Sequence, residues 1–293
     1  MQQEGSICDF SSSNSWVILS PIEQSIKRKI EAIGTPLKDW DINIYRGVLT
    51  GYNDAFIIST EKRDEILANC QTEEERQRTA ELIRPILRGR DIKRYEYEWA
   101  DLWIIATFPS RHYDIESYPA VKDYLFSIGI ERLEQTGETH IINGEKIKAR
   151  KKTCNEWFET QDSISYWEDF SKPKIVWGNL NLTASYAMVQ DNIFINAPSP
   201  MIVPANKYLL AVLNSKLADY YIRQLGVTRN GGYFEYKPMF VEKLPVPQNA
   251  DAKAVTEIES YVDSKNETAI DKAVYILYGL TEEERLYIEK KGR

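Results

Sequence analysis

The chain has 293 residues, enough for about two domains at roughly 150 residues each and for a sizeable buried core. Its composition, 43% hydrophobic and 28% charged, is typical of a globular protein. The sequence contains no apolar run of ~18 residues, the length that would cross a bilayer. Residues 1–16 lack the basic and apolar regions of a secretion signal, so we expect a cytoplasmic protein without a membrane segment.

The charge is acidic overall but unevenly distributed. A net charge of -7 and a pI of about 5.2 argue against a protein that coats nucleic acid without selectivity. Two stretches are basic nevertheless: Arg76 to Arg94 holds seven basic residues against two acids, and Lys146–Lys152 (KIKARKK) has five basic residues of seven. These runs predict either a local basic groove or an ordinary solvated surface.

The first predicted element is a helix that begins after Ser20. Ser20 can cap it, Pro21 suits its first turn, and Gly34 is expected to end it in a left-handed conformation. Ile22, Ile26, Ile30 and Ile33 form one apolar stripe at helical spacing. We therefore expect this helix to dock on another part of the chain.

The segments that follow alternate between strand and helix patterns. Residues 41–59 predict two strands around a glycine-bearing loop, 72–84 a helix that stops before Pro85, and 101–109 a buried strand. Residues 118–135 and 155–169 predict helices, and 137–152 an exposed loop or hairpin.

In the second half, four short strand candidates precede a helical end. The strand candidates are 174–179, 183–190, 192–196 and 201–203, and the helix candidates are 207–224, 252–264, 269–278 and a last one capped by Thr281 and Glu284. The pattern predicts an α+β fold with a mixed, mostly antiparallel sheet region, packed helices and a C-terminal helical segment. We divide it into an N-terminal linker and helix (1–38), a central domain (39–248) and a C-terminal helical segment (249–293).

Several kinds of chemistry are missing from the sequence. The two histidines, His112 and His140, have no second ligand at metal spacing, and no GxG dinucleotide or phosphate loop occurs. The three cysteines are odd in number and far apart, which indicates reduced thiols: Cys8, Cys70 and Cys154. Asp91 and Lys93 faintly match the acid and lysine of metal-dependent nucleases, and this remains a minor alternative.

Four stretches, taken in order, carry a resemblance to a known family. They are IYRGVLTGYNDAFII (44–58), IRPILRGRDIKRY (83–95), WEDFSKPKIVWGN (167–179) and YLLAVLNSKLADYYI (208–222), followed by LPVP (244–247). Together they resemble the TaqI-like C-terminal target-recognition domain of adenine-specific DNA methyltransferases in type IIG restriction-modification enzymes. The resemblance runs from about residue 40 to residue 247.

The resemblance implies a division of labour within a larger enzyme. In that family an N-terminal methyltransferase domain binds S-adenosylmethionine and takes an extruded adenine, because the amine cannot be reached inside the duplex. The C-terminal part reads the surrounding sequence. The catalytic Asn-Pro-Pro-Tyr motif and the cofactor loop do not occur here. We therefore expect a specificity fragment without catalytic residues, metal or cofactor of its own, with double-stranded DNA and the N-terminal methyltransferase domain as partners.

Candidate DNA-binding residues lie in four groups. Arg46 and Asn53 are of the types that pair with guanine and adenine, and glycines beside them let backbone approach a partner. The full set is Arg46, Thr50, Tyr52 and Asn53; Arg88, Arg90, Lys93 and Arg94; Lys148, Arg150, Lys151 and Lys152; and Arg229, Asn230 and Tyr233. The second and third groups suit phosphates, and the third could be an arm that orders on DNA. Asp91 is expected to hold one arginine in place.

Each group also has a structural interpretation. The first could be a turn satisfying its own backbone, the second an internal ion-pair network, and the fourth part of a strand pair. For the whole chain, the main alternative to DNA recognition is a protein-interaction scaffold in a phage-defence methyltransferase assembly, in which the isoleucine stripe and the acidic C-terminal helices bind protein.

Overall fold

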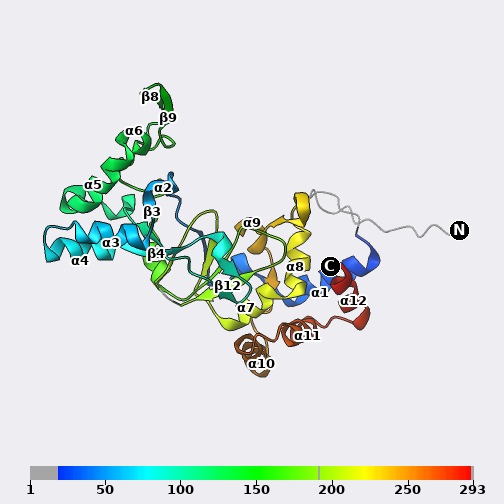
Figure 1. Cartoon of the computed structure of the whole chain (residues 1–293). Helices are drawn as coiled ribbons and strands as arrows, with labels where there is room; N and C mark the ends of the chain where they lie inside the picture. The colour runs from blue at the N-terminus through cyan, green and yellow to red at the C-terminus, as the bar shows by residue number, and fades with distance from the viewer. Residues whose placement is uncertain (1–18, 191, 292–293) are drawn as a thin grey trace. The chain divides into compact units, whose positions relative to one another are not determined.

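A computed structural model describes residues 19–190 and 192–291, so the prediction for Cys8 and residues 1–16 lies outside the described residues. The chain divides into two compact units (Figure 1). Within the described residues, unit 1 comprises 19–42, 181–184 and 206–291, and unit 2 comprises 43–180, 185–190 and 192–205. Residues 206–248 thus group with both ends of the chain, a partition that differs from the boundaries at 39 and 249 drawn from the sequence.

Unit 2 contains two four-stranded sheets. The first is antiparallel and has the order β12 (Tyr186–Val189), β10 (Lys174–Trp177), β14 (Pro200–Val203) and β2 (Asn43–Arg46). The second has the order β13 (Phe194–Ile195), β4 (Ile83–Leu87), β7 (Leu102–Ile105) and β3 (Ile57–Ser59), with β13 parallel to β4. The expected α+β class with mostly antiparallel pairing is confirmed.

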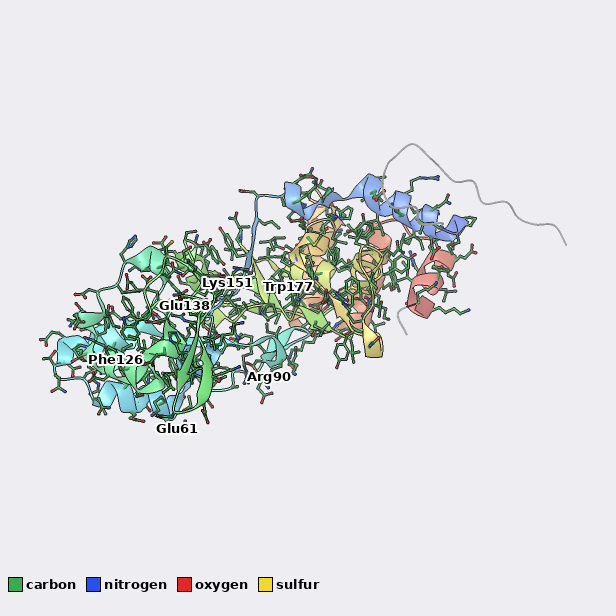
Figure 2. The ribbon with its side chains drawn as sticks, turned by 90° about the horizontal axis from the view of Figure 1, so that it is seen from above. Glu61, Arg90, Phe126, Glu138, Lys151 and Trp177 are labelled. Carbon is green, nitrogen blue, oxygen red and sulfur yellow. The ribbon has the colours of Figure 1, made fainter. Side chains whose placement is uncertain are left out.

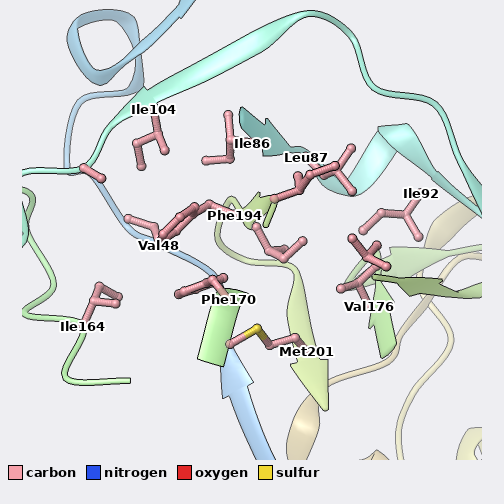
Figure 3. Packing of buried hydrophobic residues seen from close by; sticks show 14 of the residues in the cluster. Val48, Ile86, Leu87, Ile92, Ile104, Ile164, Phe170, Val176, Phe194 and Met201 are labelled. Carbon is pink, nitrogen blue, oxygen red and sulfur yellow. The ribbon is translucent and has the colours of Figure 1, made fainter. Parts of the chain in front are cut away.

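The two sheets share a hydrophobic core in which β-branched and aromatic side chains interlock (Figure 3). Phe170 and Phe194 stack with ring centroids 4.5 Å apart, and Val48, Ile86 and Val176 are fully buried around them. Burial of such side chains contributes roughly 1.5–3 kcal/mol each. This core fixes the strand ends from which the candidate loops emerge.

Helices and small hairpins complete unit 2. They are α2 (Asn53–Phe56), α3 (Thr60–Ala68), α4 (Glu73–Leu82), α5 (Pro119–Ile128), α6 (Ile130–Leu133), the short 3-10 helices η2 (Gly89–Asp91), η3 (Pro109–Arg111), η4 (Ile115–Ser117) and η5 (Trp167–Ser171), and the hairpins β5 (Ile92–Lys93) with β6 (Glu96–Tyr97) and β8 (Thr139–Ile142) with β9 (Glu145–Lys148). The two-residue strand β11 (Leu180–Asn181) follows β10 along the chain.

Local predictions in unit 2 have mixed outcomes, and two of the expected helices differ in the structure. The helix expected over 155–169 is a series of turns, because the segment's polar side chains bond to nearby backbone. The two strands predicted within 41–59 are confirmed as β2 and β3, of which β2 pairs with β14 and β3 with β7. Pro85 lies inside β4 rather than ending a helix; α4 ends at Leu82. The helix expected over 118–135 is interrupted at Gly129, where φ is +102°.

Unit 1 is mainly helical. Its elements are α1 (Pro21–Ile33), η1 (Leu37–Asp39), α7 (Lys207–Asn214), α8 (Lys216–Arg223), η6 (Asn230–Gly232), α9 (Pro238–Val241), α10 (Ala252–Asp263), α11 (Glu267–Leu277), α12 (Glu282–Lys291), the paired strands β1 (Thr35–Pro36) and β16 (Pro245–Val246), and β15 (Phe234–Glu235). The expected caps at Ser20 and at Thr281 with Glu284 are confirmed. Ile26 and Ile30 are fully buried, as the stripe predicted, whereas Ile33 is exposed.

Gly34 is required for a different reason from the one expected. Its φ is -94°, so it is extended rather than left-handed. A Cβ at this position would lie 2.4 Å from the carbonyl carbon of Pro245. The residue is glycine because α1 leads into β1, whose backbone passes closely along β16.

Candidate nucleic-acid interface

Arg150 is the organising residue of the candidate interface, although it does not reach the surface. It is only 4% exposed, and its guanidinium donates four hydrogen bonds to backbone carbonyls at 2.7–2.8 Å. These carbonyls belong to Leu133, Thr50, Glu159 and Trp157. Burial lowers the pKa of Arg150 to about 10, so the side chain is still charged at neutral pH.

The expectation that Arg150 contacts phosphate is therefore corrected. A guanidinium enclosed by carbonyls cannot meet a DNA backbone, and its fork of donors instead ties three loops together. The sequence signal was ambiguous because Arg150 lies among lysines that are exposed. The burial of Arg150 fixes the loop 47–53 beside Lys151 and Lys152.

The loop 47–53 holds its own polar groups in a compact turn. Thr50 is fully buried, donates to the Oδ1 atom of Asn53 at 2.7 Å and accepts from the backbone N–H of Tyr52 at 3.1 Å. Thr50 is thus a support rather than a surface contact. Asn53 is exposed, and its Oδ1 keeps a second lone pair for a partner. The half-buried ring of Tyr52 lies 5.4 Å from the guanidinium of Arg132.

Arg46, at the end of β2, is exposed and ion-paired at once. Its Nη2 atom lies 2.5 Å from the Oδ2 atom of Asp162, yet 58% of its side chain is accessible. The Tyr166 hydroxyl donates to the Arg46 carbonyl at 2.9 Å, and the ring of Tyr166 stacks on Tyr45 at 4.1 Å. Burial, with the nearby Asp162 carboxylate, raises the pKa of Tyr166 to about 12, which keeps this hydroxyl a donor.

In the 88–94 loop the carboxylate of Asp91 binds one arginine, Arg88. Asp91 is buried and accepts from the Arg88 backbone at 2.8 Å and from its guanidinium at 2.8 and 2.9 Å. This hydrogen bonding raises the pKa of Arg88. The expectation that Asp91 holds an arginine is confirmed. Arg90 and Lys93 remain exposed, and the Lys93 ammonium donates to the carbonyl of Arg90 at 3.0 Å.

Arg94 is half-buried and lies 5.7 Å over the ring of its neighbour Tyr95. The backbone N–H of Tyr95 donates to the carbonyl of Tyr186 in β12 at 2.8 Å. Arg94 therefore stands at the point where the loop rejoins the first sheet of unit 2.

The loops that carry Arg46 and Arg90 are neighbours at a single turn. The Gly47 N–H donates to the carbonyl of Ser199 at 2.7 Å. A Cβ on Gly89 would lie 2.7 Å from the Oγ atom of the same Ser199. Both loops therefore flank the 196–200 turn between β13 and β14, and glycine at each position permits the approach. Sequence patterns did not bring these two groups together, because Ser199 is more than a hundred residues away.

The cations of the basic run 146–152 lie in three different environments. Lys146 and Lys148 lie on strand β9 of a hairpin closed by Asn143 and Gly144, both with positive φ. Lys151 and Lys152 follow in an exposed segment that Arg150 anchors. The hairpin alternative predicted for 137–152 is confirmed. Arg90 and Lys151 can be followed in Figure 2.

The hairpin also carries an exposed apolar side chain. Ile141 is 72% exposed and pairs across the strands with Lys146, so an isoleucine and a lysine share one face. Exposed isoleucine beside cations is an arrangement that proteins use to press against bases in a groove. Ile141 is not among the predicted DNA-binding residues, although the alternation in THIINGEKIK marks the outward positions.

The fourth candidate group lies in unit 1. Arg229 is exposed but forms an ion pair with Glu235 at 3.1 Å, and Lys237 contacts the same carboxylate at 2.6 Å. Asn230 is exposed at the start of η6, and Tyr233 is 42% exposed. This group thus belongs to unit 1, whereas the other three groups belong to unit 2.

The residues of the structure were compared with the ligand sets of metals and of S-adenosylmethionine. In the described parts of the chain, no cluster of three or more His, Cys, Asp or Glu residues is arranged for a metal ion. The only near match to a methyltransferase motif, 196–200, is the hydrogen-bonded turn in which Ser199 is 1% exposed. These residues do not fit S-adenosylmethionine. None of the helices within 19–190 and 192–291 is long and apolar enough to cross a membrane.

Comparison with known proteins places this geometry in a family. The model of the TaqI-like C-terminal specificity domain matches residues 84–246, more than half of the chain. The chain belongs to this family. The TaqI-like specificity domain therefore includes η2, the β8–β9 hairpin and the 196–200 turn.

Relatives of known activity are longer than this chain. It is 23% identical over 284 residues to the type II methyltransferase M.XhoI of Xanthomonas vasicola, covering 93% of this chain and 46% of the relative. It is 22% identical over 285 residues to M.PaeR7I of Pseudomonas aeruginosa, covering 94% and 45%. The chain thus spans slightly less than half the length of each type II methyltransferase.

Two solved restriction-modification enzymes share the fold. The type IIL enzyme MmeI, solved in complex with DNA, superposes with a TM-score of 0.55 at 13% identity, covering 88% of this chain and 36% of that one. The type IIG endonuclease BpuSI superposes with a TM-score of 0.52 at 12% identity, covering 92% and 33%. The shared fold therefore covers most of this chain but about a third of either enzyme.

Proposed function

We propose that this chain recognises a specific sequence in double-stranded DNA, and that it does so as the target-recognition part of a type II enzyme that methylates adenine. The observation that carries the proposal is that loops and segments bearing exposed cations are held together by shared contacts. The Arg46 and Arg90 loops flank Ser199, and Arg150 joins the Thr50 loop to the segment of Lys151 and Lys152. Membership of the TaqI-like specificity family over residues 84–246 supports a DNA-recognition role for the part of the chain that holds Arg90, Lys151 and Lys152.

Two kinds of contact divide the work in this proposal. Arg90, Lys93, Lys148, Lys151 and Lys152 neutralise phosphates and set the register of the protein on the duplex. Arg46 and Asn53 read base edges, because a guanidinium and a carboxamide match the hydrogen-bonding edges of guanine and adenine. Asp162 pairs with the Nη2 atom of Arg46, so Arg46 reads a base through its remaining donors and contributes less to duplex affinity than Arg90.

The chemistry belongs to a methyltransferase domain in this proposal. The relatives are named as type II methyltransferases and are about twice as long as this chain. S-adenosylmethionine and the target adenine would bind that domain, because the family's catalytic motif and cofactor loop do not occur in this sequence. This chain would position the duplex so that the adenine to be extruded faces the methyltransferase domain.

Charge reversal tests the proposal directly. The Arg90→Glu/Lys151→Glu double variant should bind a short mixed-sequence duplex about tenfold to a hundredfold more weakly near physiological salt, because two phosphate contacts become repulsive. Binding is measured by fluorescence anisotropy. The matched control is Arg28→Glu/Lys38→Glu, which makes the same charge change at exposed positions of unit 1. Equal losses in both double variants would contradict a localised interface.

A further inference from the structure

A second polar site lies in unit 2, in a cavity of about 230 Å³. Buried Leu82 and Phe108 contribute apolar surface to it, and Tyr113, Tyr118 and Trp167 contribute aromatic rings. Drug-sized ligands occupy roughly 300–1,000 Å³. The cavity therefore holds about one ring system, and the rest of a larger ligand would extend past Arg78 and Arg111, which are exposed.

Three arginine residues line this cavity: Arg78, Arg84 and Arg111. Arg78 donates to the Ser117 carbonyl at 3.3 Å. Within the described residues, none of the three forms an ion pair. Glu81 is the one carboxylate among the lining residues, so the excess is two positive charges. Such an excess favours an anionic ligand.

The Arg111–Trp167 pair of the cavity can be compared with a second arginine–tryptophan pair of the molecule. Arg111 lies 4.0 Å from the ring centroid of Trp167, and Arg63 lies 4.1 Å from that of Trp103. Arg63, however, is neutralised by Asp64 at 2.9 Å. Both pairs gain the cation–π attraction, but only Arg111 combines an aromatic wall with a charge that no acid of the described chain takes up.

We propose that this cavity binds a single nucleotide unit, with the base against the aromatic and apolar walls and the phosphate on the guanidinium groups. Bases stack on aromatic rings and on arginine planes, and guanidinium groups grip phosphate oxygens through paired donors. The source of the nucleotide is either an unstacked position of a DNA strand or a free nucleotide. The lining residues include none of the exposed set of the proposed DNA interface, so the inference goes beyond the proposed function.

Calorimetric titration of the whole chain with dAMP tests the inference. Arg111→Gln should weaken dAMP binding about tenfold or more, because a charge-assisted contact to phosphate is lost. Glu81→Gln should tighten it, since the opposing carboxylate is removed. Arg63→Gln, the matched control, should leave it unchanged. Circular dichroism verifies that each variant is folded. Arg111 is exposed at the end of η3, so its replacement should disturb the fold least.

Further ligands separate the sources and the possible failures. Deoxyadenosine should bind at least tenfold more weakly than dAMP, and inorganic phosphate should compete. A short single strand that competes more strongly than dAMP identifies a strand-borne nucleotide, whereas the reverse identifies a free one; either supports the site. Absence of dAMP binding to the folded chain, or deoxyadenosine binding as tight as dAMP, would overturn it. Because Arg90→Glu/Lys151→Glu should leave dAMP binding intact, this site and the duplex interface can fail independently.

Discussion

Two arginine-bearing loops show how a neighbouring acid decides whether a cation is available to a partner. In unit 2, the carboxylate of Asp91 pairs with the guanidinium of Arg88, and Arg90 is left exposed. In unit 1, Glu235 binds both Lys237 and Arg229, and hydrogen bonds from Lys237 and Arg229 lower its pKa. The loops look alike in sequence, with arginines beside glycines. Only the first presents an unneutralised guanidinium to solvent.

The largest effect is expected at Arg150, a buried cation with four hydrogen bonds to carbonyls. Arg150→Met removes four hydrogen bonds to carbonyls and should lower the free energy of unfolding by about 3 kcal/mol or more, because several buried acceptors are left unsatisfied. Urea unfolding followed by circular dichroism measures this. Lys148→Met, an exposed position on the adjoining strand, is the control and should change stability by less than about 0.5 kcal/mol.

Arg150→Lys sharpens the same prediction. An ammonium on a flexible stem cannot span the positions of a planar fork, so lysine should recover only a minority of the lost stability. Full recovery would show that the charge alone matters, and the carbonyl-bonding role would be wrong.

The sequence predicted the elements well where local rules decide them. Ser20 and Thr281 cap their helices because capping depends on residues three positions apart. The sequence could not show which cations are free. Arg150 and Lys151 are adjacent, yet one is buried by carbonyls from four distant residues and the other is exposed. The meeting of the Arg46 and Arg90 loops at Ser199 depends on sheet topology, which residue spacing does not encode.

A middle-sized effect is expected from the exposed lysines beside Arg150. Lys151→Glu/Lys152→Glu should reduce the magnitude of the slope of log affinity against log salt by about 2, since each phosphate contact contributes about -0.9. Unfolding stability should stay within about 0.5 kcal/mol of the parent chain. Duplex titrations at several salt concentrations give the slope. An unchanged slope would place these lysines outside the interface.

A smaller effect is expected at the tip of the hairpin. Ile141→Ala should weaken duplex binding about threefold without loss of stability, because the side chain is 72% exposed in the free protein and would be buried only against DNA. Anisotropy titration measures the change. Ile276→Ala, at a position 58% exposed on α11 in unit 1, is the control and should have no effect on duplex affinity.

The smallest effect is expected at Arg229, and it tests the comparison of the two loops most closely. Arg229→Ala should alter duplex affinity by less than about twofold, because Glu235 already occupies its guanidinium in an exposed ion pair. Glu235→Gln should release both Arg229 and Lys237 and tighten duplex binding by about twofold at low salt. If Arg229→Ala weakened duplex binding as much as Arg90→Glu/Lys151→Glu does, then pairing with an acid would not be what keeps a cation from contributing to duplex affinity. The unit 1 loop would then have to be counted as part of the DNA-binding surface.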